Sequence, residues 1–135
     1  MDYQMNFSRL VNYDPGLPGI TVEVAISLIG SSVALEAKLD TGSTNCTFER
    51  HYGERLGLDI ESGERVRIGT PTGSFTAYRH FVTMAVLDYV FDAGVCFAKD
   101  ASLTRNVLGR LGFLDRIKLG LVDYDGKLYF SRYDE

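Results

Sequence analysis

The stretch VALEAKLDTGST, residues 33–44, decides the fold of this 135-residue chain. Its first part alternates inward and outward side chains, which predicts a half-buried strand. The apolar face of that strand consists of Val33, Leu35, Ala37 and Leu39. The strand ends at Asp40, which Thr41 and Gly42 follow. Because glycine permits a close approach of neighbouring backbone, this order of residues predicts a carboxylate displayed at a tight turn.

Two interpretations of this turn are open. Backbone N–H groups after the aspartate can hold a catalytic carboxylate, and the threonine hydroxyl can supply one further hydrogen bond. Alternatively, the residues form an Asx-type turn or cap the helix that follows, because Asp, Thr, Gly and Ser all favour such positions. The tetrapeptide alone does not decide between the two.

The flanking segments predict further strands and one short helix. Residues 20–28, ITVEVAISL, alternate strictly and are rich in β-branched side chains, which favours a strand. Ile29-Gly30-Ser31-Ser32 offers a turn, so the two runs predict an antiparallel hairpin. Downstream, residues 47–57 have apolar side chains at helical spacing, and Gly57 can close this short helix.

The second half of the chain predicts mostly strands. Residues 64–90 have a strand pattern on either side of Thr70-Pro71-Thr72-Gly73, where proline at the second turn position and glycine at the fourth suit a type I turn. Residues 91–98 predict a buried strand, 106–117 allow a short helix, and 118–132 predict a hairpin with an Asp-Gly turn. A mostly β chain with one or two short helices favours a small closed or sandwich-like fold.

The composition limits the class of protein. The hydrophobic content of 45% supports a packed core, and the length fits one domain. Fourteen basic against 18 acidic residues give a net charge of −4, which argues against a nucleic-acid groove. No apolar run approaches the roughly 18 residues of a membrane helix, and the first residues lack the pattern of a signal peptide. We expect a cytoplasmic protein with no nucleic-acid or membrane partner.

The cysteines and histidines give no indication of a metal site. Cys46 and Cys96 are fifty positions apart, and His51 and His80 have no ligand spacing to them or to each other. We expect free thiols, with Cys46 a small buried residue, and neither a metal nor a cofactor.

Taken in order, these features resemble the retropepsin-like aspartic proteases, the single-domain relatives of pepsin. The likeness runs from about Gly16 to Arg132. The matching features are Leu17-Pro18-Gly19-Ile20, the catalytic loop Asp40-Thr41-Gly42-Ser43, the segment from Cys46 to Leu58, the flap-like Thr70 to Phe75, and Asn106-Val107-Leu108-Gly109-Arg110. The resemblance implies a mostly β, closed retropepsin-like barrel or sandwich, with residues 16–135 as the protease domain and 1–15 as an N-terminal extension.

The resemblance also implies an aspartic endopeptidase. Two aspartates share one proton, because like charges a few ångströms apart cannot both ionise. The ionised carboxylate takes a proton from water, which attacks the peptide carbonyl while the other acid protonates the carbonyl oxygen. The chain has one Asp-Thr-Gly; Asp92-Ala93-Gly94 comes closest to a second, lacks the hydroxyl, and is interpreted as a turn. The active site therefore needs Asp40 from each chain of a homodimer.

The resemblance assigns roles to the neighbours of Asp40. Thr41 and Gly42 hold the carboxylate, and Thr41 is also expected at the dimer interface. The hydroxyl of Ser43 is placed where it can bond the outer carboxylate oxygen. Packing against the catalytic loop is expected of Val107, Leu108, Gly109 and Arg110. An ion pair of Arg110 within the subunit is in question, because Thr44-Asn45 replaces the acid expected after the motif.

The hairpin tip is expected to act as a flap over an extended polypeptide substrate, although a plain surface hairpin has the same sequence pattern. The residues expected to contact substrate there are Gly69, Thr70, Pro71, Thr72, Gly73 and Phe75. Ile68, Phe75 and Val107 are expected to line apolar pockets. The alternative function is a catalytically silent module of this fold that dimerises or binds peptides.

Overall fold

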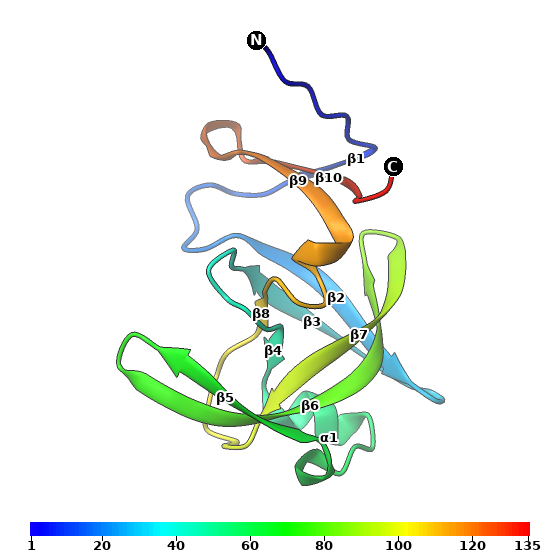
Figure 1. Cartoon of the computed structure of the whole chain (residues 1–135), viewed down its shortest axis with the longest axis vertical. Coiled ribbons are helices and arrows are strands. Elements are labelled where there is room, and N and C mark those ends of the chain that lie inside the picture. Colours follow the sequence, from blue (N-terminus) through cyan, green and yellow to red (C-terminus); the bar gives the residue numbers. More distant parts are fainter.

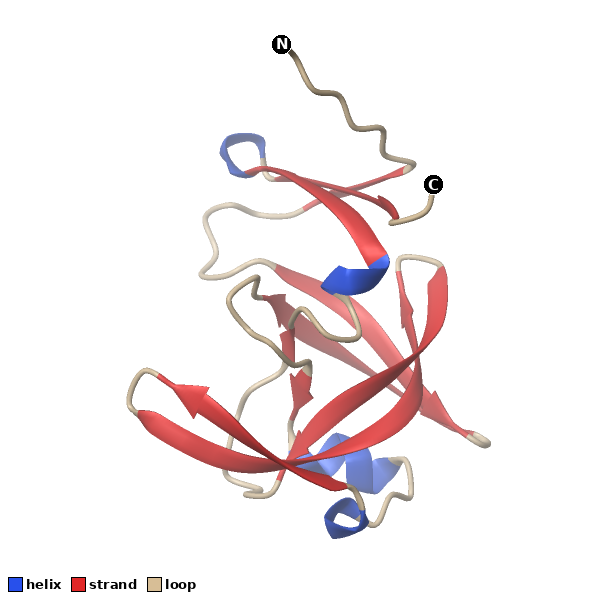
Figure 2. Cartoon of the chain, in the orientation of Figure 1, coloured by secondary structure: helices blue, strands red, loops and turns tan.

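A computed structural model describes all 135 residues of the chain. The elements are β1 (Arg9–Asn12), β2 (Thr21–Leu28), β3 (Ser31–Leu39), β4 (Thr47–Phe48), α1 (Arg50–Arg55), η1 (Ile60–Ser62), β5 (Glu64–Thr70), β6 (Gly73–Val86), β7 (Tyr89–Ala98), β8 (Val107–Leu108), η2 (Leu114–Arg116), β9 (Ile117–Val122), η3 (Asp123–Asp125) and β10 (Lys127–Arg132). Strands dominate, and the helices are all short (Figure 2). The predicted mostly β fold is confirmed.

A seven-stranded sheet forms the body of the molecule, in the order β2-β3-β8-β4-β7-β6-β5. The predicted hairpin of β2 and β3 is present, with Val24 opposite Leu35 and a left-handed Gly30 in its turn. An additional pairing of β2 with β6 closes the sheet on itself. Closure leaves β2 without a free edge, as in other small barrels. In this sheet β5 remains an edge strand, on the projecting β5–β6 hairpin (Figure 1).

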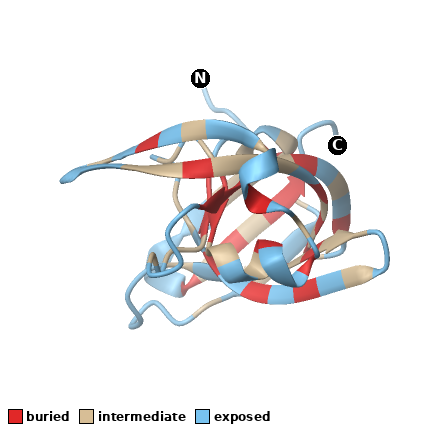
Figure 3. Cartoon of the chain, turned by 90° about the horizontal axis from the view of Figure 1, so that it is seen from below, coloured by how far each residue is buried: buried red, intermediate tan, exposed pale blue.

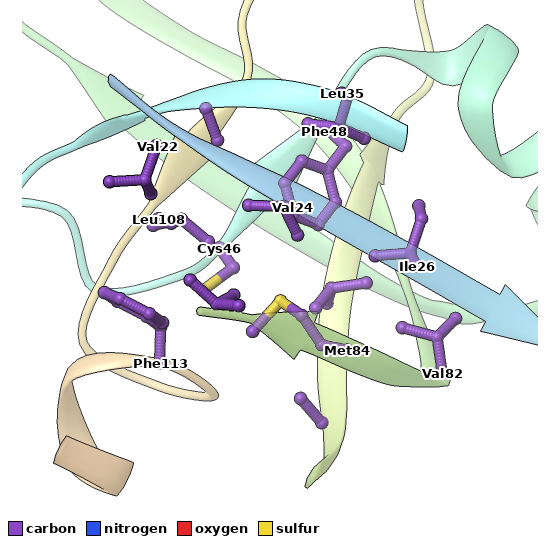
Figure 4. Close-up of a cluster of buried hydrophobic side chains, with 14 of the residues drawn as sticks. Val22, Val24, Ile26, Leu35, Cys46, Phe48, Val82, Met84, Leu108 and Phe113 are labelled. Carbon is purple, nitrogen blue, oxygen red and sulfur yellow. The ribbon is translucent and has the colours of Figure 1, made fainter. Parts of the chain in front are cut away.

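The hydrophobic core lies inside this closed sheet (Figure 4). Alternate residues of β2 and β3 point inward, among them Val24 and Leu35, and they meet Phe48, Met84 and Leu108 from other strands. The exposed residues of the same two strands face solvent, so the alternation seen in the sequence is the alternation of the folded strands (Figure 3).

A second, three-stranded sheet covers one end of the body, in the order β1-β10-β9 (Figure 1). Its β9–β10 hairpin turns where predicted, with Gly126 in the left-handed conformation. The four residues of β1 belong to the stretch expected to be an N-terminal extension, and they pair antiparallel with β10. No helix of the chain has the length and apolar character to cross a membrane.

Three local predictions are corrected by the structure. Thr47–Phe48, expected at the start of a helix, form β4 between β8 and β7, and the helix begins only at Arg50. Asp92-Ala93-Gly94, interpreted as a turn, lie inside β7, where Asp92 accepts a hydrogen bond from Thr83. The segment 106–117, for which only a short helix was expected, contains the short strand β8 in addition to the 3-10 helix η2. In each case pairing with a distant strand prevails over the local pattern.

Candidate functional site

Asp40 follows directly on β3, at the end where that strand pairs with β8. The two strands are parallel, with Leu39 opposite Leu108. The Asp40 N–H donates to the Leu108 carbonyl oxygen at 3.0 Å, and the Leu39 N–H donates to the Ile20 carbonyl oxygen at 2.8 Å. The chain at Leu39 and Asp40 is therefore held from two sides, while the side chain of Asp40 remains 39% exposed.

The loop after Asp40 is fastened to the residues after β8. The Arg110 N–H donates to the Ser43 carbonyl oxygen at 2.9 Å, and the Leu111 N–H donates to that of Thr44 at 2.8 Å. Gly109, which directly precedes these two donors, lies against the loop. A Cβ atom there would be 2.6 Å from the Ser43 carbonyl oxygen and in contact with the Asn45 carbonyl oxygen. Only glycine permits this approach, so Gly109 sets the distance between the two segments.

The carboxylate of Asp40 contacts two groups. The Gly42 N–H donates to its Oδ1 at 2.9 Å, and Nη2 of Arg105 lies 3.9 Å from its Oδ2. The Arg105 contact is an ion pair without a hydrogen bond, because the distance exceeds hydrogen-bond range. Thr41 is exposed and its hydroxyl bonds nothing within the chain. The Ser43 hydroxyl, expected at the carboxylate, instead donates to the Asn45 carbonyl oxygen at 2.8 Å.

Asn45 is held by an arginine from another strand. Nη2 of Arg79, on β6, donates to Asn45 Oδ1 at 2.8 Å, while Nη1 pairs with Glu64 at 3.0 Å. This hydrogen bond ties the end of the Asp40 loop to strand β6. Arg110 has an exposed side chain and forms no ion pair within the chain.

Two clefts meet at Asp40 and share Arg105. One, of about 600 Å³, lies between the end of β3 and the loop of residues 99–106; Val107 is at its wall. The other, of about 550 Å³, lies between the Asp40 loop and the tip of the β5–β6 hairpin. Its walls include Gly42, Ser43, Ile68, Gly69, Thr70 and Pro71. The structure thus brings the predicted loop and part of the predicted hairpin tip to one cleft, whereas Thr72 and Gly73 are not in its walls.

Phe75 does not join this cleft. It packs against a separate small cluster of Ile68, Ala77 and Cys96. Among the three residues expected to line apolar pockets, Ile68 and Val107 line the two clefts and Phe75 lines neither. The walls are mostly polar, so the sequence expectation of apolar pockets is only partly met.

Cys46 lies beneath the loop and is fully buried. Its Sγ accepts a hydrogen bond from the Gly109 N–H at 3.3 Å, and burial raises the pKa of the thiol to about 12. A thiol with so high a pKa is a poor nucleophile at neutral pH. Both cysteines are free, and Cys46 serves to pack the loop against the residues after β8.

Two arginines of the site were not found from the sequence. Arg105 lies in the loop before β8, and Arg67 lies on β5; each lines the cleft that contains Asp40. No local sequence pattern marks Arg105, which lies three residues before Leu108. Only the parallel pairing of β3 with β8, which joins segments about seventy residues apart, brings Arg105 to Asp40.

Comparison with solved structures identifies the fold. The chain is similar to the structure titled EIAV protease complexed with the inhibitor HBY-793, with a TM-score of 0.56 and 21% sequence identity over 74% of this chain and 88% of that chain. No protein-family model and no curated protein matches the sequence. The structural likeness shows that this chain has a retropepsin-like β fold.

Proposed function

We propose that the chain is an aspartic endopeptidase that acts as a homodimer, with Asp40 of each copy facing the other across a two-fold axis. The observation that carries the proposal is the position of Asp40: an accessible carboxylate, held by the Gly42 N–H at the junction of two clefts, on a retropepsin-like fold. Asp40 is the only carboxylate in the walls of either cleft. Since the chemistry requires two, a second copy is the simplest source of the other.

In the proposed reaction the two Asp40 carboxyls share one proton and hold a water between them. One removes a proton from the water as it attacks the peptide carbonyl, and the other protonates the carbonyl oxygen. Gly42 orients the carboxylate, and the exposed hydroxyl of Thr41 is free to bond the loop of the other copy. The two titrations then belong to the pair and not to either residue.

The substrate is proposed to bind as an extended strand beneath the β5–β6 hairpin. β5 pairs only with β6, so the backbone groups on its other side are free to pair with a peptide. In this role Gly69, Thr70, Pro71, Thr72 and Gly73 form a flap.

A non-catalytic peptide-binding module of the same fold is the second candidate. The Arg105–Asp40 ion pair favours it, because it engages the carboxylate that water activation requires.

Incubation of the purified chain with a mixed peptide library, with products identified by mass spectrometry from acid to neutral pH, separates the two candidates. We expect cleavage by the wild type and none by Asp40→Asn. Asp92→Asn is the matched control, because it makes the same change in the sequence nearest to a second motif and outside the clefts. Equal cleavage by wild type and Asp40→Asn, or no cleavage at any pH, would exclude the protease.

A further inference from the structure

The walls of the two clefts carry a charge opposite to that of the whole chain. The chain has a net charge of −4. Its clefts, however, are lined by three cationic side chains, Lys38, Arg67 and Arg105, and by one carboxylate, Asp40. Low-dielectric walls concentrate the field of such a cluster, so the cleft attracts anionic groups even though the protein as a whole repels them.

Arg105 is the cation closest to the proposed chemistry. Its side chain is only one-third exposed, its guanidinium donates no hydrogen bond within the chain, and its ion pair with Asp40 is long at 3.9 Å. The N–H groups of a guanidinium form a planar fork that matches a carboxylate with two parallel hydrogen bonds. Asp40 does not use this fork, which leaves it available to a ligand.

The loop that carries Arg105 is held in place. The neighbouring Asn106 exchanges two hydrogen bonds with Glu49, at 3.0 and 3.1 Å, and its carbonyl oxygen accepts from the Lys38 N–H at 2.9 Å. Farther back, the Lys99 carbonyl oxygen accepts from Arg50. A cation on an anchored loop loses less conformational freedom on binding than one on a mobile loop.

Arg67 adds a second positive group from the hairpin. Its Nε donates to Ser74 at 2.8 Å and its Nη1 approaches Thr76 at 3.4 Å, so the side chain is oriented across β5 and β6. Nη2 has no partner in the chain. The two arginines therefore enter the cleft from different elements, the hairpin and the loop before β8.

We propose that this cleft selects polypeptides with a Glu or Asp side chain directly beside the bond at Asp40, held by the guanidinium of Arg105, with Arg67 attracting a second acid farther along. The choice of substrate rests on the proposed protease, whereas the recognition of an acidic peptide does not require cleavage. The incoming carboxylate replaces Asp40 as the partner of Arg105 and leaves Asp40 free to contact water.

Matched peptides that differ only by Glu against Gln test the proposal. The acid is moved one residue at a time along an otherwise uncharged peptide, taken from the cleaved members of the library where cleavage is found, and kcat/KM is measured at low and high salt. We expect about tenfold preference for Glu at one position beside the scissile bond, weaker at high salt. Arg105→Glu should reverse the preference. Arg55→Glu, the same charge change on exposed helix α1, should leave it unchanged.

Affinity of the same peptides for the Asp40→Asn protein, measured by fluorescence anisotropy, separates the two proposals. If nothing is cleaved but the Glu peptide binds about tenfold more tightly and Arg105→Glu removes this difference, the protease fails and the recognition of acidic peptides by the cationic cleft stands. Equal kcat/KM and equal affinity for Glu and Gln peptides would overturn the inference while leaving the protease. A preference that is the same at every position would also overturn it, because it would reflect only long-range attraction.

Discussion

Replacement of Gly109 by alanine should separate the Asp40 loop from the residues that hold it. The added Cβ would lie 2.6 Å from the Ser43 carbonyl oxygen and against that of Asn45. Both obstacles are backbone atoms, so no side-chain rotation relieves the contact. Overpacking costs about 1–3 kcal/mol. The hydrogen bonds from Arg110 and Leu111 to the loop are stretched as well, at about 1 kcal/mol each.

The expected loss for Gly109→Ala is thus about 3–5 kcal/mol, a large part of the roughly 5–15 kcal/mol that stabilises a domain of this kind. Urea unfolding followed by circular dichroism measures it as a lower midpoint. Gly69→Ala is the matched control, because a Cβ there meets nothing within 4 Å and should change stability by less than about 1 kcal/mol. A Gly109→Ala midpoint equal to that of the wild type would refute the close packing of the two segments.

Three further changes test other parts of the structure. Burial raises the pKa of Cys46 from 9.0 to about 12, so between these pH values the folded state keeps a proton that the unfolded state loses. The free energy of unfolding, measured by urea unfolding, should therefore fall between pH 9 and pH 12. The fall should be smaller in Cys46→Ala. Arg79→Ala should lower kcat/KM about tenfold by releasing Asn45, whereas Glu64→Ala, which removes only the exposed partner, should leave peptide cleavage nearly unchanged. Phe48→Ala should lower stability by about 3–5 kcal/mol, because this ring is fully buried in the core; a smaller loss in thermal unfolding would contradict that placement.

The elements predicted correctly from the sequence are those whose signal is local. Alternation marks β2 and β3 because both have one buried and one exposed face, and a Pro-containing turn marks the β5–β6 hairpin. β4 and β8 were not predicted as strands because two residues cannot show a period. Asp92–Gly94 resembles a turn in composition, and only its pairing along β6 holds it in a strand.

The residues of the candidate site also differ in whether a local sequence signal marks them. The contact between the Gly42 N–H and the Asp40 carboxylate could be predicted from the motif, since the residues that make the turn are adjacent in the sequence. Ser43 was misassigned because its hydroxyl reaches the nearby Asn45 carbonyl oxygen first. Arg79 and Arg105 carry no local signal; each reaches the loop through strand pairing over tens of residues.

A mixing experiment with two forms of the chain tests the shared active site most directly. Wild-type protein is held at constant concentration while Asp40→Asn protein is added in increasing excess, with time for subunits to exchange, and peptide cleavage is measured. If each active site takes Asp40 from two copies, about ninefold excess should reduce cleavage about tenfold, because most wild-type chains then pair with an inactive partner. Asp92→Asn added in the same excess should not reduce it. Cleavage that stays constant as Asp40→Asn is added would contradict the two-chain active site.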